Sequence, residues 1–86
     1  MLSTLLMASP AIMTMLKPGK SYRLLGFKPN CDRHYRHKLL AMGFIPGTTF
    51  HALRVAPMGD PMEIKIKGFL VSLRHSEIKL LKVEEL

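Results

Sequence analysis

The stretch that decides the fold is RVAPMGDPMEIKIKG, which runs from Arg54 to Gly68. From Met62 to Lys67, apolar and charged residues alternate. This period of two is typical of a strand with one buried and one solvated face. Pro57 and Pro61 bracket a Gly-Asp pair just before this strand, which favours a tight turn. The stretch therefore predicts a β-hairpin with a stiff tip.

Short strands of the same kind are predicted on both sides of this hairpin. Their expected ranges are Ser21–Phe27, Thr49–Ala56, Phe69–Leu73 and Leu81–Glu85, with a helical turn at His75–Lys79. We expect a bulge in Thr49–Ala56, because Phe50, Leu53 and Val55 cannot share one face under strict alternation. A chain with many short strands favours a small closed barrel, since closure removes exposed sheet edges.

One helix is predicted at Asp32–Met42, between the first two strands. Asp32 is a suitable N-cap, Gly43 suits the position after the helix end, and Pro46 prevents continuation. An apolar stripe at helical spacing consists of Tyr35, Leu39 and Met42, widened by Leu40. The residues expected in the core of the domain are Leu24, Leu39, Met42, Val55, Ile64, Ile66, Val71, Leu73 and Val83.

Length and composition indicate one small domain. The chain has 86 residues, a formal net charge of +7 and one cysteine. One cysteine excludes an intramolecular disulfide and a four-cysteine zinc site, and it fits a reducing compartment. The apolar segment 1–16 contains Pro10 and is shorter than a membrane-spanning helix requires. Met13 and Met15 are alternative translation starts, so we expect an extension outside a domain at 17–86; the alternative is an interfacial membrane anchor.

Several segments resemble the FeoA family, a group of small cytosolic companions of the bacterial ferrous iron transporter. The resembling segments are LLAMGFIPGT (Leu39–Thr48), RVAPMGDP (Arg54–Pro61), FLVSLRHSE (Phe69–Glu77) and the closing strand Leu81–Glu85. The resemblance implies a mainly β, SH3-like β-barrel with one helix inserted after the first strand. It also implies a non-enzymatic, cytoplasmic protein that docks on FeoB, a membrane permease with a cytosolic G-protein domain. That partner would bring the protein to the inner face of the cytoplasmic membrane.

A protein-binding surface is predicted around the hairpin tip and the basic helix. The two prolines restrict the loop, so it loses little entropy on binding, and Met58 at its tip is an adaptable apolar contact. The residues expected to contact a partner are Arg33, Arg36, Lys38, Met58, Gly59, Asp60 and Arg74. In the alternative interpretation, Pro-Gly-Asp-Pro serves only to set the strand register. Self-association is left open.

The pattern Cys31-x-x-His34-x-x-His37 suggests a metal site. Imidazole and thiolate suit Zn²⁺ or Fe²⁺, and spacing of three places neighbours on one side of a helix. The alternative is three solvent-facing residues on a basic helix. We expect no required cofactor and at most a weak contact with Fe²⁺ or another transition metal.

Catalysis and nucleic-acid binding are weaker interpretations of this sequence. It has no Gly-x-Ser-x-Gly elbow, paired-carboxylate pattern or phosphate-binding loop. The positive charge suits nucleic acid, but Lys65 and Lys67 stand on the strand without interleaved aromatic residues for base stacking. The alternative function is a stand-alone SH3-like module that binds a transition metal or nucleic acid.

Overall fold

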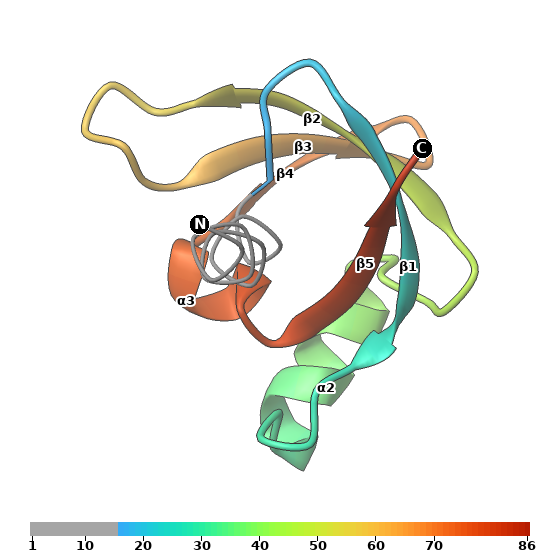
Figure 1. Cartoon of the computed structure of the whole chain (residues 1–86). Helices are drawn as coiled ribbons and strands as arrows, with labels where there is room; N and C mark the ends of the chain where they lie inside the picture. Colours follow the sequence, from blue (N-terminus) through green and yellow to red (C-terminus); the bar gives the residue numbers. More distant parts are fainter. Residues whose placement is uncertain (1–15) are drawn as a thin grey trace, which may run out of the picture.

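The computed structural model describes residues 16–86. Five strands and two helices follow one another along the chain (Figure 1). They are β1 (Ser21–Phe27), α2 (Arg33–Ala41), β2 (Thr49–Val55), β3 (Met62–Ile66), β4 (Phe69–Leu73), α3 (His75–Ile78) and β5 (Leu81–Glu85). The strands agree closely with the predicted ranges; β2 ends one residue earlier than expected. No helix within these residues is long and apolar enough to cross a membrane.

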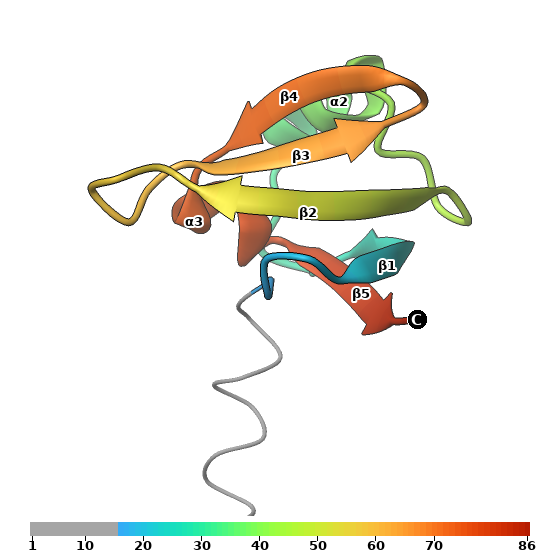
Figure 2. The same cartoon turned by 90° about the horizontal axis from the view of Figure 1, so that it is seen from above.

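The strands form one antiparallel sheet of five strands in the order β4-β3-β2-β1-β5. Figure 2 shows the sheet bent so that β1 and β5 lie below β2, β3 and β4. The expectation of a closed barrel is wrong, because β4 and β5 are the two edges and do not pair with each other. The helical turn α3 connects these edge strands, and its buried Ile78 contributes to the core there.

The hairpin of β3 and β4 has the predicted alternation. Met62, Ile64 and Ile66 are buried, whereas Lys65 points to solvent. The connecting residues Lys67 and Gly68 have φ angles of 51° and 82°. Two consecutive positive φ angles define a type I′ turn, whose twist matches that of the strands it joins. A two-residue turn fixes the register, and with it the face on which each side chain lies.

The predicted bulge in β2 is confirmed. Its pairing with β3 shifts between Ala52 and Arg54, so Leu53 is the extra residue. Phe50 and Ala52 are buried before the shift. Because the bulge resets the alternation, Arg54 faces outward and forms a 2.6 Å hydrogen bond with Glu63 on β3.

Helix α2 begins and ends as the sequence predicts. The Asp32 carboxylate accepts a 2.9 Å hydrogen bond from the Tyr35 N–H, as an N-cap does. At the other end, Gly43 has a φ of 106°, and the Phe44 N–H donates to the Leu39 carbonyl at 3.0 Å. With the Gly43 N–H bonded to the Leu40 carbonyl, this is a Schellman motif. Both Phe44 and Leu39 are fully buried, which anchors the helix end in the core.

The core contains more residues than the pattern predicted. Of the predicted set, Leu24, Leu39, Ile64, Ile66 and Leu73 are buried, while Met42, Val55, Val71 and Val83 are partly buried against them. Three aromatic rings join the core: Tyr22 and Phe44 lie 5.8 Å and 5.4 Å from Phe50, centroid to centroid. Tyr35 was expected on the apolar stripe but is 38% exposed, near Lys38.

The predicted boundary of the domain needs one correction. Leu16 was assigned to the extension outside the fold, yet it is 4% exposed and belongs to the core. The next residue, Lys17, donates its N–H to the Tyr22 hydroxyl at 2.7 Å, and this bond holds Leu16 against the sheet. The rest of the predicted extension, residues 1–15, lies outside the described residues.

Candidate functional site

The loop between β2 and β3 presents one large apolar side chain to solvent. Met58 is 92% exposed at its tip. The Ala56 carbonyl accepts a 2.8 Å hydrogen bond from the Gly59 N–H, and the Ala56 N–H donates to the Pro61 carbonyl at 2.9 Å. Gly59 has a φ of 91°, which a residue with a side chain rarely adopts. The loop is therefore internally bonded and holds Met58 outward.

His75 fixes this loop to the start of α3. Its Nε2 lies 2.6 Å from the Gly59 carbonyl oxygen and must carry the proton, because a carbonyl only accepts. Its backbone N–H donates to the Asp60 carboxylate at 3.0 Å. Asp60 and Gly59, predicted to meet a partner, thus make contacts within the domain. Sequence reasoning assigned no role to His75, since it lies 15 and 16 residues from these partners.

Glu77 connects α3 to α2 and is only 6% exposed. Its carboxylate accepts a 2.9 Å bond from Lys38 Nζ and a 3.0 Å bond from the Arg74 N–H. Burial raises the pKa of this carboxyl, but the hydrogen bonds from Arg74 and Lys38 and their positive charges lower it more, so the net pKa lies below its ordinary value. Lys38, predicted to meet a partner, is therefore already paired.

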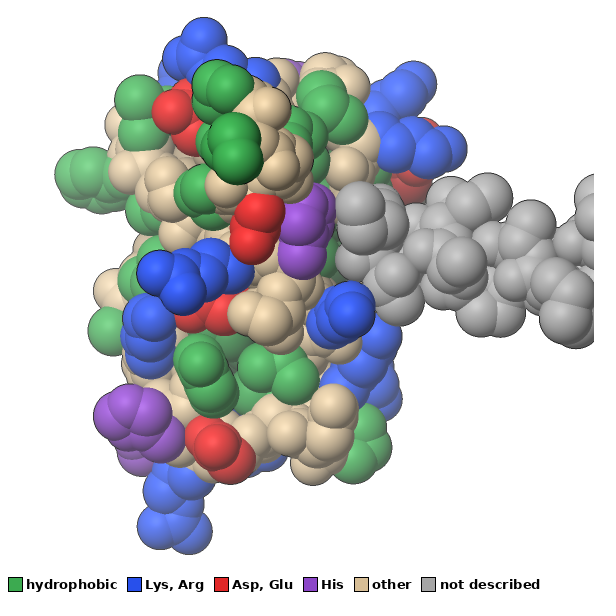
Figure 3. All heavy atoms as spheres, turned by 90° about the vertical axis from the view of Figure 1, so that its left-hand side faces the viewer, with side chains coloured by type: hydrophobic (Ala, Val, Ile, Leu, Met, Phe, Trp, Pro, Cys, Tyr) green, Lys and Arg blue, Asp and Glu red, His purple; other side chains and the backbone are tan. Residues whose placement is uncertain are grey.

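The seven predicted contact residues lie on three neighbouring elements, and we call them the loop–helix surface. They are Arg33, Arg36, Lys38, Met58, Gly59, Asp60 and Arg74. His75 connects the loop to α3, and Glu77 connects α3 to α2. Arg33 and Arg36 are exposed in the N-terminal half of α2, and Arg36 donates a hydrogen bond to the Cys31 carbonyl at 3.3 Å. Figure 3 shows this side of the molecule, with hydrophobic, basic and histidine side chains next to one another.

The charges of the chain leave the loop–helix surface positive. All six acidic side chains are engaged: Asp32 caps α2, Asp60 binds the His75 N–H, and the four glutamates form ion pairs. Four of the thirteen lysines and arginines take part in those pairs. Arg33, Arg36 and Arg74 form no ion pair among the described residues, although the Arg74 charge acts on Glu77 at longer range. This surface therefore suits an acidic partner.

The structure does not bring the predicted metal ligands together. Cys31 is 1% exposed, and its Sγ lies 3.8 Å from the Asp32 carbonyl oxygen. His34 and His37 are exposed on α2. Because Asp32 caps the helix, Cys31 precedes the first turn and its side chain is in the core. Residues 16–86 contain no group of three His, Cys, Asp or Glu side chains that could hold a metal ion.

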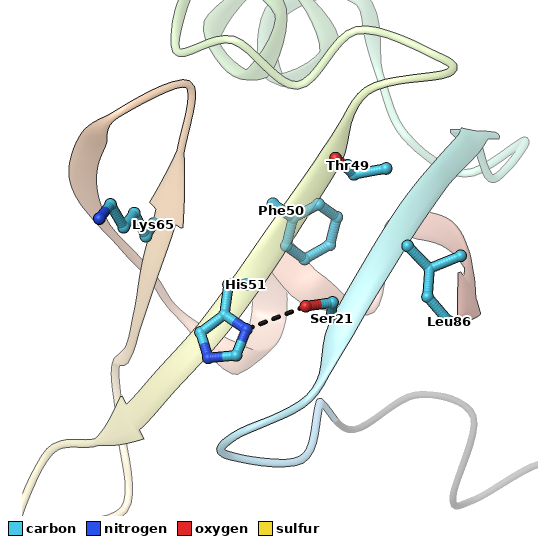
Figure 4. Close-up of a pocket in the computed structure, with 6 residues that line it drawn as sticks. All are labelled: Ser21, Thr49, Phe50, His51, Lys65 and Leu86. Atoms are coloured by element: carbon cyan, nitrogen blue, oxygen red, sulfur yellow. Dashed lines mark hydrogen bonds between the residues drawn. The ribbon is translucent and has the colours of Figure 1, made fainter.

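A shallow pocket lies near the other end of β2, away from the loop tip (Figure 4). Its volume is about 290 Å³, and its lining consists of Ser21, Thr49, Phe50, His51, Lys65 and Leu86. Ser21 Oγ and His51 Nδ1 are 3.0 Å apart across β1 and β2. No Asp or Glu side chain is among the lining residues, so the Ser-His pair lacks the acidic side chain of a Ser-His-Asp triad. In Figure 4 the Lys65 side chain points away from the pair.

Comparisons of the sequence with known proteins agree on one family. The family model described as FeoA domain matches residues 13–85. The chain is 36% identical over 50 residues to a Fe(2+) transport protein A/Fe(2+) transporter FeoB fusion protein of Porphyromonas gingivalis. That match covers 58% of this chain but spans only 6% of the length of the fusion protein.

Two solved structures support the same fold. An FeoA-like protein from Clostridium acetobutylicum superimposes with a TM-score of 0.75 and 32% identity, covering 86% of this chain and 84% of that one. A zinc complex of Stenotrophomonas maltophilia FeoA, described as an SH3 domain protein, has a TM-score of 0.70, with coverage of 84% and 87%. At 20% identity, the second likeness shows the SH3-like fold alone.

Proposed function

The chain belongs to the FeoA domain family, and from that membership we propose that it is a non-enzymatic component of bacterial ferrous iron transport that docks on a FeoB-type membrane transporter. On this proposal the domain acts by binding to the transporter, and this binding requires no cofactor. Docking on such a transporter would place the domain in the cytoplasm, at the inner face of the cytoplasmic membrane.

The observation that carries the proposal is the Porphyromonas gingivalis relative. Its name joins a Fe(2+) transport protein A and a FeoB transporter in one fusion protein. Linking two modules holds each at a high effective concentration near the other, so even a weak contact between them is occupied. A domain similar to the fused one is therefore a reasonable partner for a transporter of the same kind.

The loop–helix surface supplies contacts suited to this role. Met58 is a flexible apolar side chain held on an internally bonded loop, so an interface around it loses little loop entropy. Arg33 and Arg36 on α2 and Arg74 at the start of α3 add positive charge to the loop–helix surface, and none of them forms an ion pair with a described acid. An acidic patch on the transporter, beside the anionic inner leaflet, would complement that charge.

Modulation of the transporter would follow from unequal affinity for its states. A domain that binds two nucleotide states of a G-protein domain equally well cannot shift the equilibrium between them. A tenfold preference for one state corresponds to about 1.4 kcal/mol of bias. The proposal thus requires a measurable difference in affinity between nucleotide states.

The test is an NMR titration of the ¹⁵N-labelled chain with the cytosolic G-domain and with the complete transporter in nanodiscs, each with GDP and with a GTP analogue. We expect localised amide shifts that include the loop and α2, with different affinities in the two nucleotide states. Met58→Glu should weaken binding about tenfold, since it places a charge in an apolar contact.

The matched control is Leu25→Glu, which adds the same charge at an exposed leucine on β1. This variant should bind like the wild-type chain. Absence of binding to the complete transporter would contradict the proposed function. Binding that is equally insensitive to both substitutions would retain the transporter as partner and exclude the Met58 loop.

A further inference from the structure

The two edges of the sheet differ in chemistry. At one edge, β5 (Leu81–Glu85) carries Lys82, Glu84 and Glu85, and these glutamates pair with Arg23 and Lys17. At the other edge, β4 has the sequence FLVSL and no charged residue. Charged side chains on an edge strand discourage another strand from pairing with it, whereas an uncharged edge permits it. The β4 edge therefore lacks the protection that β5 has.

The backbone of β4 has free hydrogen-bonding groups at alternate residues. The two-residue turn makes Ile66 and Phe69 a hydrogen-bonded pair, so Phe69, Val71 and Leu73 bond to β3. The N–H and C=O groups of Leu70 and Ser72 then point away from β3. In the part of the chain that the structure describes, β3 is the sole strand that pairs with β4.

Both faces of this edge carry an exposed apolar side chain. Leu70 is opposite Lys65 on the outer face of the sheet and is 66% exposed. Phe69 is opposite the buried Ile66, on the inner face, yet it is 71% exposed at the corner of the hairpin. A strand added to this edge would cover Leu70 with one face and Phe69 with the other, because successive side chains of a strand alternate in direction.

We propose that the β4 edge accepts an extended segment of a partner protein that carries apolar and acidic residues, adding a strand to the sheet. Such strand addition takes its affinity from main-chain hydrogen bonds and its specificity from alternate side chains. This proposal rests on the proposed function in one respect: the partner named for the segment is the FeoB-type transporter.

The charges around β4 favour an acidic segment. Lys65 and Lys67 precede the strand and Arg74 follows it, and none of them forms an ion pair among the described residues. Glu63 lies opposite Ser72, but Arg54 neutralises it at 2.6 Å. Carboxylates on an added strand would therefore meet uncompensated lysine and arginine.

A second copy of this chain fits the edge less well. An antiparallel pairing of two β4 strands about Val71 would bring Lys67 of one copy next to Arg74 of the other. Like charges at neighbouring positions of a sheet are destabilising, and each copy has a formal net charge of +7. Charge complementarity thus favours an acidic partner over self-association.

Amide hydrogen exchange tests the proposal directly. In the free full-length chain, the Leu70 and Ser72 amides should exchange quickly, whereas those of Phe69, Val71 and Leu73 are protected by β3. Addition of the complete transporter should protect Leu70 and Ser72. A blocked peptide of alternating Glu and Val should do the same at higher concentration, and its Lys-Val counterpart should not.

Two substitutions at one position provide the matched pair. Leu70→Pro removes the outward N–H without removing a bond to β3, and proline is tolerated on edge strands. It should weaken binding of the transporter and of the acidic peptide about tenfold, the expected loss for one hydrogen bond and altered packing. Leu70→Val keeps the N–H and an apolar side chain and should bind within about twofold of the wild-type chain.

The outcomes separate this inference from the proposed function. Transporter binding that leaves Leu70 and Ser72 unprotected and tolerates Leu70→Pro overturns the edge site and leaves the proposed function intact. If the transporter does not bind at all, the proposed function fails, and the acidic peptide decides the edge site through the same two amides. Protection of these amides in the free chain overturns the inference, since the edge would already be covered. If Leu70→Pro does not fold, the exchange of the Leu70 and Ser72 amides in the wild-type chain decides whether the edge is the binding site.

Discussion

Replacement of Glu77 by glutamine tests how the loop–helix surface is held together. The Glu77 carboxylate is buried between α3 and α2 and bonds to Lys38 at 2.9 Å and to the Arg74 N–H at 3.0 Å. Glutamine has nearly the same shape and keeps an oxygen for the Arg74 N–H. It loses the negative charge that faces Lys38 and the start of α3. The Glu77→Gln variant therefore isolates the charge from the packing.

The expected loss in the free energy of unfolding is about 1–1.5 kcal/mol at pH 7. A hydrogen bond to a charged group contributes about 1.5–3 kcal/mol. The Lys38 side chain is 52% exposed, so solvent screening reduces its share toward the lower values seen for surface pairs. With a slope of about 1 kcal/mol per molar urea for a domain of this size, the urea midpoint should fall by about 1 M.

The dependence on pH gives this prediction its sharpest test. In the folded chain the pKa of Glu77 is below its ordinary value of 4.5. Ionised Glu77 therefore stabilises the folded state fully above about pH 4.5, and this contribution disappears as the pH falls through the folded pKa. Urea unfolding should show the full difference between the wild-type chain and Glu77→Gln at pH 7 and a smaller one at pH 3.5.

Lysine substitutions provide the control for this series. Lys38→Met removes the partner of Glu77, and a double-mutant cycle with Glu77→Gln should show a coupling of about 1 kcal/mol. Lys82→Met removes an exposed lysine that has no acidic partner among the described residues, and it should change stability by less than about 0.5 kcal/mol. A difference between wild type and Glu77→Gln that stays constant from pH 7 to pH 3.5 would refute the role of the Glu77 charge.

Two further predictions concern backbone geometry and the single thiol. Gly43→Ala should lower the free energy of unfolding, measured by thermal unfolding, by about 1–2 kcal/mol, because Gly43 has a φ of 106°; steric contact is not the cause, since an added Cβ would meet nothing nearer than 3.8 Å. Gly26→Ala is the control and should be near neutral, because Gly26 has a φ that other residues adopt and lies in open space. Equal effects of the two substitutions would contradict the argument. Cys31 should react with a thiol reagent at least about a hundredfold more slowly in the folded chain than in urea, because it is buried; rapid reaction in native buffer would show that the thiol is accessible.

The sequence determines those features that depend on neighbours along the chain. Alternation from Met62 to Lys67 specifies β3, since side chains of a strand point to opposite faces. Asp32 and Gly43 mark the ends of α2 because an N-cap carboxylate and a residue at positive φ satisfy groups within one turn. The bulge in β2 follows from a break in the same alternation. The family, too, could be identified from short motifs in order.

The tertiary structure decided how distant groups meet. Lys38 and Glu77 are 39 residues apart in the sequence, and His75 and Gly59 are 16 residues apart, so no local sequence pattern predicts either contact. Cys31 does not join His34 and His37 in a metal site, because Asp32 caps the helix and Cys31 therefore precedes it, where apolar packing buries its side chain. Which strands become the edges depends on the order of all five strands in the sheet. Local periodicity sets the form of each element, whereas burial of the shared core sets their arrangement and thereby creates the surfaces available for binding.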